Sequence, residues 1–407
     1  MAETTRALDV PSEALGRHEE HFWPSDPTAY GPRGQRGGLY RPFVPVRIAA
    51  REFPLSGAAV AAVVKAAQAL EHLNSKPPRV ATMAALARNL LRSESAASSR
   101  IEGVRISHKR LARAAYQDRK GRRDPRAAEV LGNVSAMERA IELGSSAARL
   151  SVADIEDIHR TLLRFTEDSH IAGVVRDKQN WIGGNDFNPV GATYVPPPPA
   201  YVHDLLEDLC EFVARTDLAP IAQAAIAHAQ FENIHPFIDG NGRTGRALIY
   251  TVLRRRGEVR NYIPPISLIL VSEPKAYVGG LGAYSTGGVS LWCDRFADAT
   301  GRAARRAEEL ADAIEERQTR WLERLGNPRS DAAARQLVGV LPAQPVIDVP
   351  VAQALTGKSH VAVGNALQQL EAAGIIKRLN ERKWGRVWES DELLTLVERV
   401  EKSLGTL

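Results

Sequence analysis

Apolar residues recur at a spacing of three or four through most of the chain between residues 56 and 325. Ile155, Ile158 and Leu162 form one such run. This spacing places apolar side chains on one face of an α-helix, so the chain is predicted to be mainly α-helical. The expected helices span residues 56–73, 80–97, 125–143, 151–163, 201–215, 219–234, 242–256 and 290–325.

Two stretches interrupt the helical pattern. Residues 1–57 are rich in Gly, Pro and Arg, with one short extended piece at residues 43–46. Residues 173–199 combine Val, Trp and Tyr with several Gly and Asn, and they end in a run of prolines. This composition is typical of a β-hairpin followed by a rigid stop. We therefore expect a partly ordered leader and a hairpin between two helices.

The pattern changes again after Pro328. Helices are expected at 331–340, 350–355 and 359–373, and two strands at 375–379 and 384–389. This order is that of a winged helix-turn-helix, and Gly357 lies in the turn between the paired helices, where a glycine is common.

These breaks divide the chain into four segments. Residues 1–75 hold the leader and first helix, residues 76–124 hold a second helical region, residues 125–326 form the main helical domain, and residues 327–407 form a winged-helix-like domain.

Composition argues against several classes of protein. Cys210 and Cys293 are too few and too far apart for a disulfide framework or a cysteine zinc site, which fits a reducing compartment. Residues 1–27 contain no apolar run of the kind that a secretory signal needs. The most apolar stretch, residues 262–271, is too short to span a membrane. A cytoplasmic protein without membrane contact is expected.

The most informative window runs from His235 to Arg246, with the sequence HPFIDGNGRTGR. It follows one apolar helix and opens the next. Pro236 should end the first helix at His235 and leave the imidazole on an exposed corner. Gly240, Asn241 and Gly242 tolerate left-handed turns, in which successive N–H groups can cradle an anion beside a helix N-terminus.

The charged residues of this window add chemistry to the cradle. Arg243 and Arg246 are three residues apart and can bind further phosphates on one face of the second helix. Asp239 can hold a divalent cation that bridges phosphate oxygens. His235 supplies a base that titrates near neutral pH. Together these groups predict a phosphate-transfer site.

The window resembles the signature of Fic-domain proteins, H-x-F-x-[D/E]-G-N-G-R-x-x-R, at every fixed position. The resemblance implies a Fic helical fold in residues 125–326 and an enzyme that moves AMP from ATP to a Ser, Thr or Tyr hydroxyl of a protein. It implies that His235 is the general base, that Phe237 anchors the loop, and that Asp239 binds Mg²⁺. The implied contacts to the nucleotide phosphates come from Gly240, Asn241, Gly242, Arg243 and Arg246.

The segment before the window resembles the hairpin flap of the same family. In that family an extended target segment pairs with the flap edge, which places its hydroxyl near the base. A plain structural hairpin is the alternative. The residues expected at this edge are Val174, Val175, Arg176, Thr193, Tyr194 and Val195.

Ser98, Glu102 and Gly103 resemble the family's inhibitory pattern, [S/T]-x-x-x-E-[G/N]. The resemblance implies that residues 76–124 carry a brake, in which Glu102 pairs with Arg246 and occupies the guanidinium that should take the γ-phosphate. A shielded Arg–carboxylate pair is among the stronger polar contacts. By itself, a Ser four residues before a Glu is also common on solvated helices.

Lys and Arg number 53 against 48 Asp and Glu, a net charge of only +5, so their positions matter more than their sum. One basic stretch lies between residues 100 and 126. It could bind nucleic acid, but a solvated face is the commoner interpretation. Its basic residues are Arg100, Arg105, His108, Lys109, Arg110, Arg113, Arg119, Lys120, Arg122, Arg123 and Arg126.

A second basic stretch is the expected wing, with Lys377, Arg378, Arg382, Lys383 and Arg386. The helix before it, expected at residues 359–373, holds no Lys or Arg after its start, and such modules also serve as protein-contact or dimerisation units. Val361, Val363, Leu367 and Leu370 are expected in its core. Several side chains at the start of this helix and along it are of kinds that bind bases or phosphates: Lys358, Ser359, His360, Asn365, Gln368 and Gln369.

The favoured hypothesis is an autoinhibited AMP-transferring enzyme that uses ATP and Mg²⁺ and acts on a protein, with self-modification as one option. One alternative is a DNA-binding regulator whose Fic domain senses nucleotide. Another is an enzyme that removes AMP or transfers a different phosphate-containing group. A homodimer is compatible with each of them.

Overall fold

The computed structural model describes residues 14–28, 31, 35–75, 77, 82–122, 124–380 and 385–402. Some residues named in the sequence analysis lie outside this description: Arg123, Arg382, Lys383 and Trp384, the expected start of the second wing strand.

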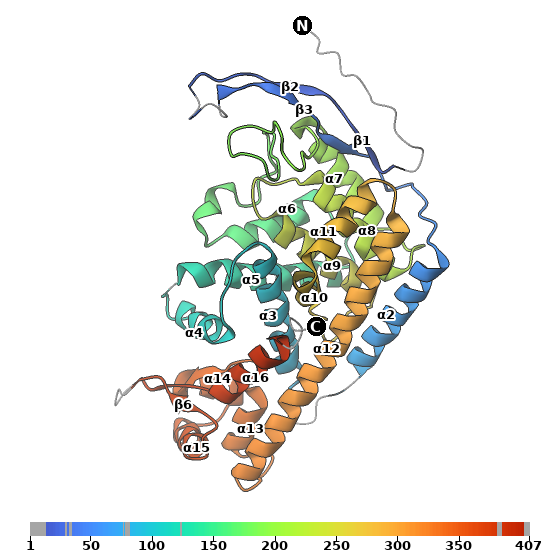
Figure 1. Cartoon of the computed structure of the whole chain (residues 1–407). Helices are drawn as coiled ribbons and strands as arrows, with labels where there is room; N and C mark the ends of the chain where they lie inside the picture. The colour runs from blue at the N-terminus through green and yellow to red at the C-terminus, as the bar shows by residue number, and fades with distance from the viewer. Residues whose placement is uncertain are drawn as a thin grey trace. The chain divides into compact units, whose positions relative to one another are not determined.

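Most of the described chain is helical, as predicted (Figure 1). The helices are α2 (Gly57–Ser75), α3 (Met83–Ile101), α4 (His108–Asp118), α5 (Pro125–Ser145), α6 (Val152–Leu163), η1 (Glu167–Ile171), α7 (Pro199–Val213), α8 (Pro220–Ile234), α9 (Asn241–Arg255), α10 (Ile266–Ser272), α11 (Pro274–Ser285), α12 (Val289–Arg324), α13 (Ala333–Val340), α14 (Val349–Thr356), α15 (His360–Ala372) and α16 (Asp391–Lys402).

The strands are short and form three small antiparallel sheets. β1 pairs with β4, β2 pairs with β3, and the third sheet has the order β5-β7-β6. Only β4 and the two wing strands were expected from the sequence. The strands are β1 (Gly16–His18), β2 (His21–Trp23), β3 (Gly38–Tyr40), β4 (Phe43–Pro45), β5 (Val346–Asp348), β6 (Lys377–Arg378) and β7 (Val387–Glu389).

The segment between α6 and α7 pairs across its two sides as expected of a hairpin, but without two regular strands. One antiparallel bridge, Ile182 to Tyr194, is the pairing found between its two sides. Gly183 and Gly184 have φ angles of 73° and 81°, which strand backbone cannot adopt. Proline lacks the N–H that a ladder requires, so the prolines that follow Val195 end the pairing.

The chain forms two compact units, each built from separated segments. The first comprises residues 1–64, 138–257 and 275–298, and the second comprises residues 65–137, 258–274 and 299–407. The four-segment division made from the sequence stays a prediction. Among the described helices, none is both long and apolar enough to cross a membrane.

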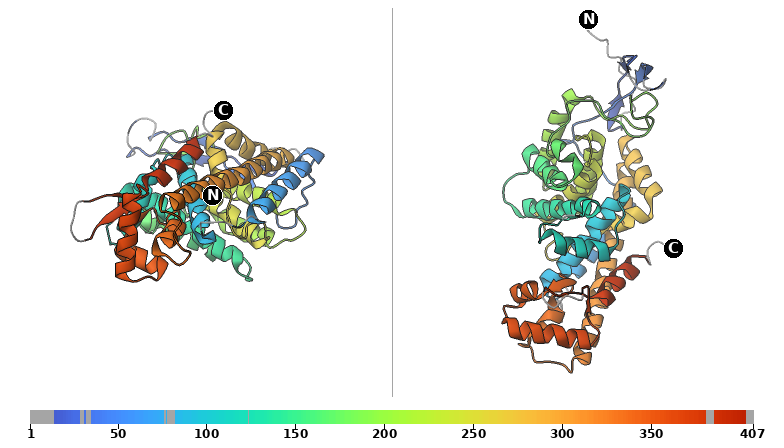
Figure 2. Two further views of the ribbon diagram at one scale, coloured as in Figure 1. Left: turned by 90° about the horizontal axis from the view of Figure 1, so that it is seen from below. Right: turned by 90° about the vertical axis from the view of Figure 1, so that its left-hand side faces the viewer.

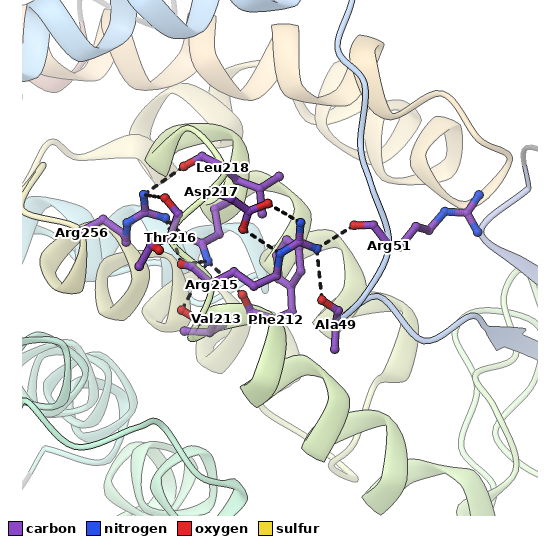
Figure 3. Close-up of polar contacts among 10 residues, drawn as sticks. Ala49, Arg51, Phe212, Val213, Arg215, Thr216, Asp217, Leu218 and Arg256 are labelled. Carbon is purple, nitrogen blue, oxygen red and sulfur yellow. Dashed lines mark hydrogen bonds and ion pairs between the residues drawn. The ribbon is translucent and has the colours of Figure 1, made fainter.

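Helix α8 lies at the centre of the first unit. It packs against α7, α9 and β4, and nearly all of its residues are buried (Figure 1). Its start is held by two arginines at the α7–α8 connection (Figure 3). Arg215 donates to the carbonyl of Arg51 over 2.6 Å, and Arg256 donates to the carbonyl of Leu218 over 3.0 Å. The Arg256 bond satisfies a backbone carbonyl of the connection, and the Arg215 bond joins the connection to the segment before α2.

In the second unit, α3 packs along α10. The carboxylate of Glu94, which is fully buried, accepts hydrogen bonds from the backbone N–H and the hydroxyl of Ser267 at 2.8 and 2.5 Å. A buried charge must be bonded in this way to be tolerated.

Two buried carboxylates of the C-terminal segment hold α4 in the same unit. Glu389 on β7 accepts two 2.8 Å bonds from Arg113. Glu401 on α16 lies 2.7 Å from His108 and 3.7 Å from Arg100 at the end of α3. Helix α4 was missed in the sequence because most of its residues are charged or small, which leaves a sparse apolar pattern.

Helices α13, α14 and α15 pack on one another, close to the β5-β7-β6 sheet (Figure 2). Helix α14 ends at Gly357, whose φ angle of 66° is the left-handed conformation that favours glycine at a helix end. Val363, Leu367 and Leu370 are buried on α15, as predicted, but Val361 is 70% exposed. Val361 is the second residue of α15, in its first turn and away from the buried face.

Candidate functional site

His235 terminates α8 in an unusual backbone conformation. Pro236 ends the helix as predicted, but His235 adopts left-handed angles (φ 49°, ψ 60°) in place of extended ones. Its carbonyl accepts a 2.9 Å bond from Arg176 Nε, which holds this conformation. The residue is half-buried, so the expected exposed corner is not found. Non-glycine residues in such angles cluster at functional sites.

The loop after His235 is anchored by Phe237 and Asn241. Phe237 is fully buried, as expected for an anchor. The Asn241 side chain makes two bonds to the Phe237 backbone: it accepts from the N–H at 2.8 Å and donates to the carbonyl at 2.7 Å. Gly240 has a φ of 76°, whereas Asn241 begins α9 and Gly242 continues it. The expected three-residue left-handed turn is therefore one glycine followed by a helix N-terminus.

His159 on α6 supports this loop, and the sequence did not identify it. Its ring stacks on Phe237 with centroids 3.7 Å apart. Its Nδ1 accepts from the N–H of Gly173 at 2.9 Å, so its Nε2 carries the proton and donates to the carbonyl of Asp239 at 2.9 Å. Burial lowers the His159 pKa to about 4, so the ring is neutral at pH 7. Its position four residues after Ile155, on the apolar face of α6, was the available signal.

Because the native state holds His159 neutral, acid should destabilise the fold. The unfolded chain takes up this proton near pH 6.5 and the native state only near pH 4, so stability is lost as pH falls between these values. At pH 5 the expected loss is about 2 kcal/mol. Urea unfolding at pH 7 and pH 5 measures it, with His159→Gln expected to remove this part of the pH dependence. The exposed His203→Gln is the control; an equal effect of both variants contradicts the assignment.

Arg243 and Arg246 lie in the first turns of α9 with exposed fractions of only 4% and 1%. Arg243 donates to Oδ2 of Asp239 over 2.8 Å, and Asp239 is half-exposed. A Cβ on Gly245 would lie 2.8 Å from Cδ1 of the buried Phe231 ring on α8, so glycine allows the two helices to approach this closely. The site therefore presents two arginines held within the protein beside a helix N-terminus.

His228 on α8 is a buried histidine near Arg246. It is fully buried, and its Nε2 lies 2.9 Å from the hydroxyl of Tyr277. Burial, followed by the nearby charge of Arg246, lowers its pKa to about 3. A neutral histidine here adds no positive charge that would compete with the two arginines for an anion.

The segment before α7 holds the His235 loop from the other side. Arg176, which is 3% exposed, donates to the carbonyls of His235, Lys178 and Pro197. Asn180 donates to the carbonyl of Phe237 at 2.8 Å. The structure thus uses Arg176 to fix the loop, a role that the sequence did not indicate.

The remaining residues of this segment differ in exposure. Val174 and Thr193 are exposed and Val175 is half-buried, whereas Val195 is buried and the Tyr194 hydroxyl donates to the carbonyl of Asn233 at 2.7 Å.

Ser98, Glu102 and Gly103 lie at the end of α3, in the second unit. Ser98 is fully buried and Glu102 is exposed. Glu102 is the C-cap of α3, and Gly103 follows with a φ of 84°. The chain therefore leaves the helix directly after Glu102, as the Gly predicts.

Among the described residues, no group of three or more His, Cys, Asp or Glu side chains could by itself hold a metal ion. Mg²⁺ is commonly bound by one or two carboxylates together with substrate phosphates. The half-exposed Asp239 beside the α9 N-terminus fits that arrangement.

Comparison with known proteins identifies two family regions. Residues 60–142 match the model described as Fic/DOC family N-terminal, and residues 149–253 match the Fic/DOC family. The protein adenylyltransferase Fic of Drosophila willistoni is 32% identical over 152 residues, which are 37% of this chain and 28% of that protein. The protein adenylyltransferase fic-1 of Caenorhabditis elegans is 34% identical over 131 residues, which are 31% of this chain and 23% of that protein. The chain thus spans about a quarter of the length of these curated relatives.

A Fic family protein from Desulfovibrio desulfuricans has a similar fold, with a TM-score of 0.51 over 83% of this chain and 97% of that chain, at 20% identity. The predicted resemblance in the helical part of the chain is confirmed. Residues 60–142 and 149–253 of this chain are thus similar to the two regions described for the Fic/DOC family.

Proposed function

We propose that this chain is a protein adenylyltransferase, which moves AMP from ATP to a Ser, Thr or Tyr hydroxyl of a protein. The loop from His235 to Arg246 carries this proposal, because it joins a base, a carboxylate, a helix N-terminus and two buried arginines in one rigid turn. Two relatives named protein adenylyltransferase are 32% and 34% identical to parts of this chain. Phosphoryl-type transfer depends chiefly on positioning and on neutralising charge, which such a turn supplies.

In the proposed reaction the target oxygen attacks the α-phosphorus of ATP. The new bond joins this oxygen to AMP, the bond from the α-phosphorus to the bridging oxygen breaks, and pyrophosphate leaves. His235 takes the hydroxyl proton. The N–H groups at the start of α9 and the guanidinium of Arg243 stabilise the phosphate charge, and Arg246 binds the γ-phosphate. Asp239 would hold Mg²⁺, which neutralises phosphate charge when it is bound.

The target protein is proposed to lie against the segment between α6 and α7. Its exposed residues Val174 and Thr193, and the exposed Ile182 of the single bridge, are available to an extended peptide. The buried Val195 and Arg176 and the half-buried Tyr194 support this edge. A second copy of the chain is one such target.

Inhibition by Glu102 is proposed as the regulation of this activity. Glu102 is exposed at the end of α3. Pairing with Arg246 would occupy the group that should take the γ-phosphate, so ATP would bind in an unproductive pose.

The C-terminal elements are proposed to be a winged helix. Three helices (α13, α14, α15) and the β5-β7-β6 sheet occur in the order that this fold requires, with Gly357 between α14 and α15. Strand β5 adds to the sheet, and helix α16 packs on α4. The sequence predicted neither element.

Labelled nucleotide tests the activity. The protein is incubated with Mg²⁺ and either α-³²P-ATP or γ-³²P-ATP, and labelled protein is resolved on a denaturing gel. AMP transfer labels protein from the α-phosphate and not from the γ-phosphate. Label from γ-³²P-ATP would instead indicate phosphate transfer. Release of AMP from a modified protein, without incorporation, would indicate the reverse reaction.

A further inference from the structure

Exposed apolar side chains are concentrated on the two loops that flank His235. Val174, Ile182 and Phe187 lie on the segment between α6 and α7, with exposed fractions of 56%, 44% and 42%. Ile238 lies in the motif loop, three residues after His235, and is 48% exposed. Large apolar side chains that share an exposed surface commonly mark an interaction site. These loops therefore present a surface suited to an apolar partner.

Two contacts align the segment after α6 with the motif loop. The N–H of Arg176 donates directly to the carbonyl of Pro236 at 2.9 Å. Farther along, the ring of His159 bridges the two segments, because it accepts from the N–H of Gly173 and donates to the carbonyl of Asp239, each over 2.9 Å. Residues 173 to 176 therefore run antiparallel to residues 236 to 239.

Val174 and Ile238 share one register between these contacts, since each is one residue from the histidine bridge. Both side chains are exposed, whereas the next residue on each segment, Val175 or Phe237, is half-buried or fully buried. The two exposed side chains thus lie on the solvent side of the aligned segments. Val174 and Ile238 together are called the apolar strip below.

We propose that the apolar strip selects the protein target, by contacting a large apolar side chain two residues from the hydroxyl that receives AMP. This inference rests on the proposed AMP transfer, because the hydroxyl must reach His235. In an extended peptide alternate side chains point the same way, so a side chain on the same face as the hydroxyl is two residues from it. A polar side chain at that position would lose water against the apolar strip without gaining a hydrogen bond, which is unfavourable.

Synthetic peptides test this preference. Each has one Thr as its only hydroxyl residue and carries Leu, Asn or Glu two residues before and after it. Binding of fluorescein-labelled peptide is measured by anisotropy without nucleotide, and transfer by label from α-³²P-ATP, both with the Glu102→Gly protein. We expect the Leu peptide to bind about 3- to 10-fold more tightly than the Asn peptide, because partial burial of a Leu side chain stabilises a complex by about this factor. The same ratio is expected in the KM for transfer.

Two variants and one control make the test specific for the apolar strip. Val174→Thr combined with Ile238→Thr keeps β-branched side chains and removes apolar surface, so the Leu and Asn peptides should then bind within about twofold of each other. Val174→Lys should shift the preference to the Glu peptide, which a purely structural role of Val174 would not produce. Val278→Thr on α11 alters a side chain that is 65% exposed and should leave the Leu preference unchanged. Far-ultraviolet circular dichroism confirms that each variant is folded.

The outcomes separate this inference from the proposed reaction. Equal binding of the three peptides, a Leu preference that persists in the double variant, or a Val174→Lys protein that does not favour the Glu peptide overturns the role of the apolar strip. Label in the peptides without a Leu preference overturns that role and leaves AMP transfer intact. A Leu preference in binding without label in any peptide supports the selectivity of the strip and contradicts the transfer. A changed oligomeric state of the double variant in light scattering, with peptide preference unaltered, would assign the strip to contact between two copies instead.

Discussion

Replacing His235 with alanine is expected to reduce AMP transfer by about 10²–10⁴-fold, the usual contribution of a positioned base. ATP affinity should stay nearly unchanged, because the proposed phosphate contacts come from the N-terminus of α9 and from Arg243 and Arg246. Transfer is measured by incorporation of label from α-³²P-ATP and ATP binding by calorimetry, both in the Glu102→Gly background so that the brake does not mask the change.

The control for this variant is His203→Ala, which removes an exposed histidine of the same unit. A His235→Ala protein that transfers AMP at the parental rate would show that another group takes the proton. A variant that loses ATP binding as well would show that His235 holds the loop, since its carbonyl already accepts from Arg176 and its angles are left-handed.

The second large effect is expected at Glu102. Replacing it with glycine should raise self-modification by about 10- to 100-fold, because a hydrogen bond to a charged group contributes about 1.5–3 kcal/mol. Glu102 follows the last residue of α3, so the glycine does not interrupt the helix interior. The measurement is the initial rate of label incorporation from α-³²P-ATP into the protein and into added lysate proteins.

Two further variants make this test specific for charge. Glu102→Gln keeps the size of the side chain and removes its charge, so it should also release activity, whereas Glu102→Asp should keep partial inhibition. Glu102→Gly combined with His235→Ala should be inactive. Incorporation that is unchanged or lower in the glycine and glutamine variants would rule out the brake and leave the proposed transfer reaction intact.

The helices were predictable wherever apolar spacing was regular. Helix α6 begins at Val152, next to the predicted Ser151, and α12 extends from Val289 to Arg324 against a predicted 290–325. Helix α4 was missed because charged residues dominate it and its apolar residues are few. Ion pairs to Glu389 and Glu401 hold this helix in place. These partners lie about 280 to 290 residues away in the sequence, and no local sequence pattern predicts them.

The residues of the motif were predictable from the sequence, but the residues that hold the motif loop in place were not. The window from His235 to Arg246 is contiguous, so its chemistry could be read directly. Its rigidity comes from His159 and Arg176, which lie 80 and 59 residues from the atoms that they contact in the loop. The assignment of Asn241 to the anion cradle stays a prediction, and the bonds of its side chain to the Phe237 backbone were not predicted. Pairings of this kind depend on tertiary structure, and a single sequence does not encode them as a pattern.

The buried carboxylates on β7 and α16 connect residues 389–401 to the helices before them. A truncation after residue 326 would remove Glu389 and Glu401, and Arg113 and His108 would lose the buried charges that they contact. Arg100 would lose a carboxylate 3.7 Å away, two residues before Glu102. The C-terminal segment therefore cannot be removed without altering the contacts of α3. Displacement of α16 would take the Glu401 carboxylate away from Arg100 at the end of α3.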